Sequence, residues 1–420
     1  MTGPGPGSGG KGGPEAAGAS GEGIRDLGVW LAISVWTAGW GWNRHDPSGI
    51  SWHFFSGGVR WLFGARGLHL YADHPDLQIG PLAFLVVQAL SPLPPATQRV
   101  VAQVLMTAVA PLLLVILAPL VGGTPARRRV RLLLSGLVLA PAWTVLSVRW
   151  MHLEDALALL LSVLAVRWVA LAVRAGGPRW AASAGGLALG AAMAAKPWTV
   201  GFVPILLVLP VRELLPAAGT SVALAAAAWG PFLVADTATI AAFHPLLGVS
   251  DSSGLWTLGY RGTQVPAWDR TVQLILAPVA AAAVALRRRW PGVLLAAIAV
   301  RLALDPQDIG YYAAGAVLAA LVFDLLATDS TLPWAGLVTA VVFWQPFVTD
   351  FPHRFTTTHG LTLWWFRHPA VVGSVHLAWS LAALLLVVRP RRDPPVARPV
   401  RRAHREPIVP DPVPSDPDGL

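Results

Sequence analysis

The sequence predicts an all-α fold: a polytopic bundle of transmembrane helices with further helices lying at the membrane surface. Of its 420 residues, 55% are hydrophobic and 13% are charged, and the mean hydropathy is +0.57. A soluble protein carries about 25% charged residues, and a soluble core of this size could not bury so much apolar surface. The apolar stretches are continuous and do not alternate with polar residues, which favours helices over a membrane β-barrel.

The two ends of the chain differ from its middle. Residues 1–23 are rich in Gly, Pro, Ala and Ser, so we expect a disordered tail. No basic segment leads into a short apolar stretch with a cleavage site, which predicts 27–42 as a retained first span. Residues 389–420 form a basic, proline-rich tail, typical of a cytoplasmic anchor near acidic headgroups. The net charge of +9 arises from this tail and from arginines beside the spans, so nucleic-acid binding is not expected.

Hydropathy predicts about 12 spans, within a range of 11–13 because several segments are shorter than the ~20 residues that a span usually needs. These spans lie near residues 27–42, 97–121, 132–148, 156–173, 180–195, 198–211, 214–235, 271–286, 291–304, 311–327, 332–348 and 369–388. The short apolar segment 79–95 is closed by prolines and is predicted as a juxtamembrane helix. Counting it as a span would place the arginine-rich segment 126–131 outside the cell, although cytoplasmic loops collect Lys and Arg.

This topology sorts the polar residues by side. It predicts a plasma-membrane protein with both termini in the cytoplasm. The extracytoplasmic loops are then 43–96, 149–155, the turn at Lys196, 236–270, 303–311 and 349–368. Nine of the 11 histidines and eleven Asp or Glu residues lie in these loops. The sequence therefore predicts an active site on the extracytoplasmic face, at the membrane boundary.

Three motifs follow one another on that predicted face. The first loop begins "WNRHDPSG" (42–49), continues with the amphipathic aromatic segment 50–64, and ends with "GLHLYADHPDLQIGPL". The segment 50–64 has the composition of an interfacial helix. A second loop reads "VRWMHLEDALALLL" (148–161), and a lysine-proline junction follows in "GAAMAAKPWTVGF" (190–202).

The order and shared side of these motifs resemble the GT-C superfamily of polytopic glycosyltransferases. Within it, the chain is most similar to the actinobacterial mannosyltransferases that use polyprenol-phosphate-mannose. The likeness covers about residues 27–212 and implies a catalytic module at 24–212, followed by a variable transmembrane module at 213–388. One departure is that residues 74–78, "HPDLQ", stand where the family usually has Tyr-x-Tyr-Pro-Pro.

The resemblance implies transfer of a sugar from a polyprenyl-phosphate donor to an acceptor hydroxyl on a lipid or glycan. Mannose is the expected sugar, and arabinose or another pentose is the alternative. Asp46 is the candidate general base, because a carboxylate must take the proton of the attacking hydroxyl. The same residue also suits a simple Asp-Pro turn at the end of the first span.

The departing phosphate needs cations in a site with little water. Lys196 is the first candidate, since it is one of two lysines in the chain and ends a span; a snorkelling interfacial lysine is the alternative. Arg149 is the second candidate for donor binding, with Arg261 and Arg301 behind it, although a single arginine of this kind is more often a structural ion-pair partner. The residues expected to bind the acceptor or sugar are Glu154, Asp155, His45, Tyr71 and His74.

Glu154 and Asp155 also suit a second, structural interpretation, because acidic residues are favoured at any helix N-terminus. No cofactor is expected. His152 with these two carboxylates does not have the spacing of a zinc signature, and a divalent metal there is kept as a minor alternative. Two other classes stay open: a transporter or lipid flippase, which would need ionisable residues within the spans, and a non-catalytic scaffold of the same fold.

Overall fold

All the named secondary-structure elements in the described part of the chain are helices, as the composition predicted. The structure is a computed structural model, and it describes residues 15–42, 48–174, 177–244, 247–343, 364 and 367–389. These ranges contain no β-strand, apart from an isolated bridge between Gly248 and Gln264. The N-terminal elements are α1 (Glu15–Trp42), α2 (Trp52–Leu62), η1 (Gly67–His69), α3 (Leu70–Asp73), α4 (Pro81–Gln88), α5 (Pro95–Leu117), η2 (Ala118–Leu120), α6 (Pro125–Thr144), η3 (Val145–Trp150), α7 (Leu153–Ala172) and α8 (Trp180–Ala195).

The C-terminal half continues in the same way. Its elements are η4 (Pro197–Val208), α9 (Val211–Ala235), η5 (Thr237–Phe243), α10 (Gly254–Thr257), α11 (Asp269–Leu286), η6 (Trp290–Gly292), α12 (Val293–Leu304), α13 (Tyr312–Ala327), α14 (Trp334–Val342) and α17 (Pro369–Val388). The short helix α4 falls inside segment 79–95, which was predicted as a juxtamembrane helix. Because α1 begins at Glu15, residues 15–23 of the expected N-terminal tail are helical; this stretch contains three alanines and two glutamates, which are good helix formers.

Six of the described helices are long and apolar enough to cross a membrane, so the chain is a helical membrane protein. They are Pro95–Leu120, Pro125–Trp150, Leu153–Ala172, Val211–Ala235, Asp269–Leu286 and Pro369–Val388. Four shorter apolar helices accompany them, including η4, whose 12 residues form a 3₁₀ helix. A 3₁₀ helix rises about 2.0 Å per residue against 1.5 Å in an α-helix, so η4 reaches as far as about 16 α-helical residues. The predicted total of 12 spans stays a prediction.

Small residues bring the central helices close together. Gly186 and Gly190 lie one turn apart on α8, and a Cβ atom at either position would overlap the backbone of α9. Close backbone approach at small residues is how helices associate in lipid, where no hydrophobic force distinguishes one helix from the solvent. The α8–α9 contact fixes the end of α8, from which Lys196 projects.

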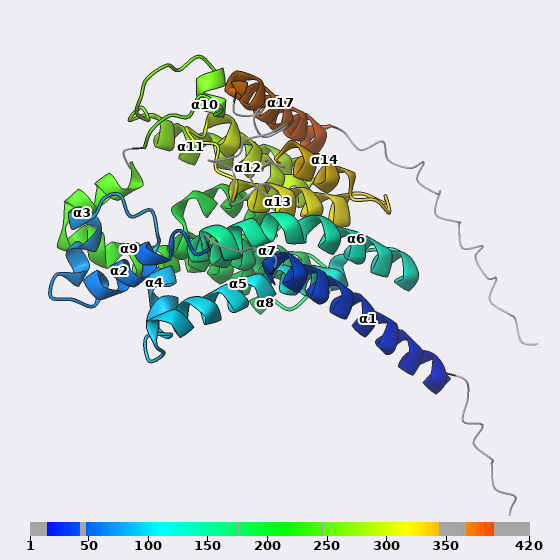
Figure 1. The fold of residues 1–420 in the computed structure, drawn as a ribbon. Coiled ribbons are helices and arrows are strands. Elements are labelled where there is room, and N and C mark those ends of the chain that lie inside the picture. The colour runs from blue at the N-terminus through cyan, green and yellow to red at the C-terminus, as the bar shows by residue number, and fades with distance from the viewer. Residues whose placement is uncertain are drawn as a thin grey trace, which may run out of the picture. The chain divides into compact units, whose positions relative to one another are not determined.

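The helix connections gather at two opposite ends of the bundle (Figure 1). At one end lie α2, α3, α4 and α10, and backbone hydrogen bonds join their loops: Gly49–Ser51 to residues 148–150, Gly80 to Ala195, and Ser250 to Pro306. At the other end, Arg131 donates to the carbonyls of Asp324, Leu325 and Thr328, and Arg129 pairs with Asp26. The described parts of the loops that the sequence analysis assigned to the outside thus share one end, although the compartment that each end faces stays a prediction.

The described residues up to Val388 form one compact unit. The helices before and after residue 212 belong to the same unit, because α8 packs on α9 and η4 packs on α11. The division into modules at 24–212 and 213–388 therefore stays an interpretation of the sequence.

Candidate active site

The second loop owes its shape to an irregular end of α6. The helix continues into a π-helical turn, Val145–Trp150, and Met151 then takes a left-handed conformation with φ of 54°. This backbone is uncommon for a residue other than glycine and recurs at functional sites. The carbonyls of residues 148–150 are left free by the turn, and they accept hydrogen bonds from the amides of Gly49, Ile50 and Ser51 at 2.9–3.0 Å. The first loop is thereby held against the second.

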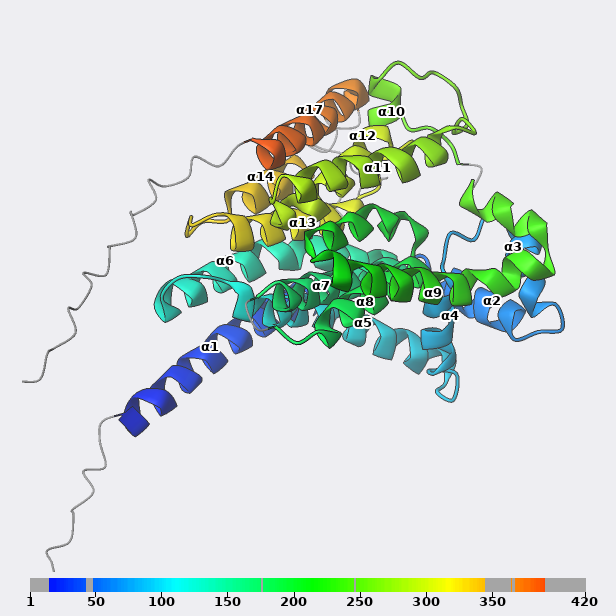
Figure 2. The same cartoon turned by 180° about the vertical axis from the view of Figure 1, so that it is seen from behind.

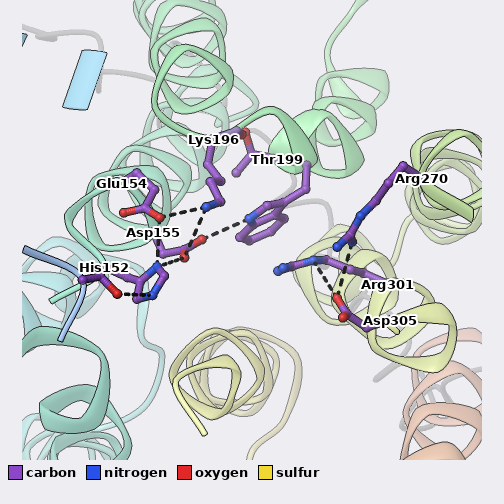
Figure 3. Close-up of polar contacts among 10 residues, drawn as sticks. His152, Glu154, Asp155, Lys196, Thr199, Arg270, Arg301 and Asp305 are labelled. Atoms are coloured by element: carbon purple, nitrogen blue, oxygen red, sulfur yellow. Dashed lines mark hydrogen bonds and ion pairs between the residues drawn. The ribbon is translucent and has the colours of Figure 1, made fainter. Parts of the chain in front are cut away.

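His152, Glu154, Asp155 and Lys196 form one buried cluster just beyond this turn (Figure 3). The Lys196 Nζ atom lies 2.8 Å from Glu154 Oε1 and 3.9 Å from Asp155 Oδ2. The His152 Nδ1 atom lies 2.9 Å from the same Glu154 oxygen, and its Nε2 atom is 3.1 Å from Ser51 Oγ. The side chains of Glu154 and Asp155 are 1% and 5% exposed, so two carboxylates are compensated here by one lysine and one histidine.

Lys196 is placed by the junction between α8 and η4. The helix ends at Ala195, and Lys196 adopts an extended backbone with φ of −153° because Pro197 follows it. The Gly80 amide donates to the Ala195 carbonyl at 2.9 Å, which attaches the start of α4 to this junction. The lysine side chain therefore leaves the end of α8 toward the start of α7, where both carboxylates stand.

The charge of His152 follows from its neighbours. Burial lowers the pKa of its imidazole, but the adjacent Glu154 and Asp155 carboxylates raise that pKa by more, and it lies above its ordinary value. The ring also stacks on Tyr311, with centroids 3.8 Å apart. Burial raises the pKa of the Tyr311 hydroxyl well above its ordinary value, so this group stays protonated.

Next to the cluster lies a pocket of about 80 Å³ that combines cations with aromatic rings. Its polar lining includes Lys196, Arg270 and Arg301. The other residues that line it are Leu77, Gln78, Pro197, Trp198, Trp229, Ala242, Phe243, Gln273, Leu274, Ala277, Tyr311 and Tyr312. Trp198 joins the pocket to the cluster, because its Nε1 atom donates to Asp155 Oδ1 at 3.1 Å.

The structure brings three of the predicted site residues together: Lys196, Glu154 and Asp155. The two predicted residues that follow the first span, His45 and Asp46, lie outside the described residues. Arg149 is buried beside Trp150, with its guanidinium 5.9 Å from that ring, and it is not among the described residues that line the pocket.

Tyr71 and His74 lie away from the pocket lining. The buried Tyr71 hydroxyl donates to the Ile79 carbonyl at 2.8 Å, and its ring packs on Trp229. His74 stacks on Trp61 with centroids 3.8 Å apart. These contacts give the two residues packing roles, and the sugar contacts that the sequence analysis expected of them stay a prediction.

Sequence reasoning missed Arg270 and Asp305 in this site and gave Arg301 a minor place. A signal was present, since each of the three stands at an end of a predicted span, next to apolar residues. Spacing within the chain does not reveal that these ends meet Lys196. All three residues follow Lys196 by more than 70 positions.

His152, Glu154 and Asp155 also offer three ligand atoms within 4.8 Å of one another, which is close enough to hold a metal ion. The Lys196 ammonium already donates to one oxygen of Glu154. A divalent cation held by these three residues would lie close to this positive charge and be repelled by it, so the donor set fits an ammonium better than a metal.

No family model, characterised protein or solved structure matches this chain significantly. The chemistry of the site must therefore be argued from its geometry. Buried carboxylates beside a pocket lined by three cations are suited to holding a polar group next to a negatively charged one, as in phosphate-linked substrates.

Proposed function

We propose that this protein is a membrane glycosyltransferase that moves a sugar, with mannose as the expected one, from a polyprenyl-phosphate donor to an acceptor hydroxyl. The observation that carries the proposal is the convergence of Lys196, Arg270 and Arg301 on one pocket beside two buried carboxylates. A sugar-phosphate needs both kinds of group, since carboxylates accept hydrogen bonds from sugar hydroxyls and cations neutralise the phosphate.

The proposed step forms one bond and breaks one. The acceptor oxygen attacks the anomeric carbon, the bond from that carbon to the phosphate oxygen breaks, and the polyprenyl phosphate keeps the bonding electrons. The hydroxyl proton passes to a carboxylate, for which Asp46 is the candidate. The transition state has oxocarbenium character, which nearby carboxylates stabilise.

Glu154 and Asp155 act in this proposal on the sugar or the acceptor. Asp155 already accepts from Trp198 Nε1, and Glu154 accepts from Lys196. Their positions are therefore fixed before a substrate binds, which lowers the cost of ordering the site during reaction. The reaction needs no metal or organic cofactor.

The proposed location of the reaction is the extracytoplasmic face of the plasma membrane. The polyprenyl chain of the donor is too apolar to leave the bilayer. The donor must therefore enter sideways, with its phosphate at headgroup depth. The pocket fits this requirement because it lies near the ends of α8, α11 and α12 and its lining includes apolar residues.

The decisive experiment incubates the purified protein in lipid nanodiscs with radiolabelled polyprenyl-phosphate mannose and polyprenyl-phosphate arabinose. We expect label to move from one donor into extracted lipid or glycan acceptors. A matched preparation of the Glu154→Gln/Asp155→Asn variant serves as the control for contaminating transferases. Movement of an intact labelled lipid between leaflets without transfer would instead identify a flippase. If neither result were obtained, a non-catalytic scaffold would remain.

A further inference from the structure

The wall of the pocket opposite Lys196 is formed by two arginines from the second half of the chain. Arg270 stands in the first turn of α11, and Arg301 stands in the last turn of α12. Their nitrogens lie 3.6 Å and 3.8 Å from the same Asp305 oxygen, which has no hydrogen-bond partner. Both distances exceed a hydrogen bond, so one carboxylate is shared loosely by two guanidinium groups.

Arg301 is held in place without using its hydrogen-bond donors. Its guanidinium lies 4.3 Å from the Trp198 ring centroid and 4.9 Å from that of Tyr312, between two aromatic rings. Its side chain is 12% exposed, and its Nε atom has no hydrogen-bond partner among the described residues. A guanidinium has five N–H donors, and leaving them unpaired in a site with little water is costly. Figure 3 shows this group extending toward the side on which Asp155 and Lys196 lie.

The Lys196 ammonium, in contrast to the Arg301 guanidinium, is already closely paired. Its ammonium donates to Glu154 at 2.8 Å and lies 3.9 Å from Asp155, so its charge is already balanced by carboxylates. A phosphate that bound to Lys196 would have to approach these two anions. The arginine pair therefore offers the better place for a phosphate.

An apolar wall continues from the arginines along α11. Leu274 and Ala277 follow Arg270 at the fourth and seventh positions, which places all three on one face of the helix. Trp229 and Phe243 of the α9–η5 region line the same pocket from the other side. Both α9 and α11 contact η4, and in Figure 2 α11 lies above α9.

From this arrangement we infer that Arg270 and Arg301 bind the phosphate of the lipid-linked substrate, and that its hydrocarbon chain leaves between α9 and α11. Lys196 is then a positioning residue, which holds Glu154 and Asp155 for the sugar or the acceptor. This inference rests on the proposed function for the identity of the lipid. It reassigns the phosphate from Lys196 to residues outside the part of the chain that carries the family resemblance.

The test measures binding of decaprenyl monophosphate to the purified protein in nanodiscs by native mass spectrometry. Losing one charge-assisted contact weakens binding about 10- to 100-fold, so we expect Arg270→Gln and Arg301→Gln each to lose affinity by this factor. The double variant Glu154→Gln/Lys196→Met removes the lysine without leaving Glu154 charged, and it should bind within about 3-fold of wild type. Arg60→Gln, an exposed arginine of α2 outside the pocket lining, is the matched control for general attraction to charge.

The inference is overturned if both arginine variants bind like Arg60→Gln, or if the Glu154→Gln/Lys196→Met variant loses as much affinity as they do. Should Arg301→Gln fail to fold, Arg301→Lys keeps the charge beside Asp305 and removes the planar fork, and it should still bind more weakly than wild type. Competition by decaprenol or inorganic phosphate should be negligible, because each lacks one half of the ligand. Equal competition by phosphatidylglycerol would indicate a general anionic-lipid site and would refute the specific one.

The path of the hydrocarbon chain is tested by photo-cross-linking. A benzophenone residue in place of Leu274 should cross-link to decaprenyl monophosphate, while the same residue in place of the lipid-facing Val279 should not do so above background. Equal cross-linking at both positions would refute the path. Because binding needs no sugar, arginine-dependent binding without any sugar transfer would refute the proposed function and leave this inference intact.

Discussion

At the residue scale, the site is built on compensation between buried charges. Glu154, Asp155, Lys196 and His152 are buried or nearly so, and no one of them would be tolerated in this place without the others. This gives each of them a structural reason to be present as well as a chemical one. Experiments on the site must therefore separate folding from activity.

The pair formed by Glu154 and Lys196 gives the first prediction. Lys196→Met or Glu154→Gln alone leaves buried charge with too few partners, and each should lower the free energy of unfolding by about 3–5 kcal/mol. The double variant should recover a large part of this loss, as measured by chemical unfolding in detergent. Losses that simply add in the double variant would show that the two groups are not coupled.

His152 gives a second prediction, on pH. Its folded-state pKa is raised above the unfolded value of about 6.5, so the stabilisation is complete below that value and is lost as the pH rises through the folded-state pKa. The difference in melting temperature between wild type and His152→Gln should therefore be largest near about pH 6 and shrink toward about pH 9. His53→Gln, at an exposed position of α2, is the control for removing a histidine.

Asp46 gives a third prediction, on rate. If it is the general base, Asp46→Asn should reduce sugar transfer by about 10²- to 10⁴-fold while binding of decaprenyl monophosphate and the melting temperature are unchanged. The readout is initial velocity with the donor identified in the transfer experiment. Turnover near the wild-type value would remove Asp46 from the mechanism.

At the scale of elements, the site depends on two irregular helix ends that meet. The π-helical turn at 145–150 redirects the chain so that Glu154 and Asp155 stand in the first turn of α7. The end of α8 at Ala195 presents Lys196 to them, and α4 supports this end through the Gly80 amide. The meeting of the end of α8 with the start of α7 therefore fixes the distance between Lys196 and the carboxylates of Glu154 and Asp155.

Gly80 gives the prediction at this scale. A Cβ atom at Gly80 would overlap the carbonyl oxygens of Ala194 and Ala195, so Gly80→Ala must push α4 away from the end of α8. We expect a loss of about 1–3 kcal/mol in unfolding free energy together with reduced transfer. Gly39→Ala in α1 meets no atom within 4 Å, and it should stabilise the protein by up to about 1 kcal/mol. If Gly80→Ala changed neither the unfolding free energy nor the transfer, the close contact between α4 and the end of α8 would be contradicted.

At the scale of the whole molecule, the arginine-rich segments and the pocket lie at opposite ends of the bundle. Arginines near residues 126–131 and 287–289 lie at one end, and the pocket lies near the other. From the positive-inside rule we predict that the arginine-rich end faces the cytoplasm. On this prediction the pocket lies where the proposed lipid-linked donor, in the outer leaflet, could reach it.

The absence of cysteine makes this topology testable. Asp251→Cys lies at an exposed position of the pocket end and should react with a membrane-impermeant thiol reagent in intact cells. Gly122→Cys lies at an exposed position of the opposite end, with no atom near its Cβ position, and should react only after the membrane is opened. Labelling of Gly122→Cys in intact cells would reverse the topology and, with it, the proposed side of the reaction.

The sequence by itself determined the helical membrane class, because lipid as a solvent requires long apolar segments whose backbone bonds are satisfied internally. It also identified Lys196, Glu154 and Asp155 as a group, since charged residues at the ends of apolar spans are few and costly. Only the folded chain shows that Arg270 and Arg301 meet Lys196 at one pocket, and that Tyr71 and His74 make packing contacts. Hydropathy locates a helix along the chain but not the neighbour it packs against. That choice depends on close contacts such as those at Gly186 and Gly80, which form only when distant segments fold together.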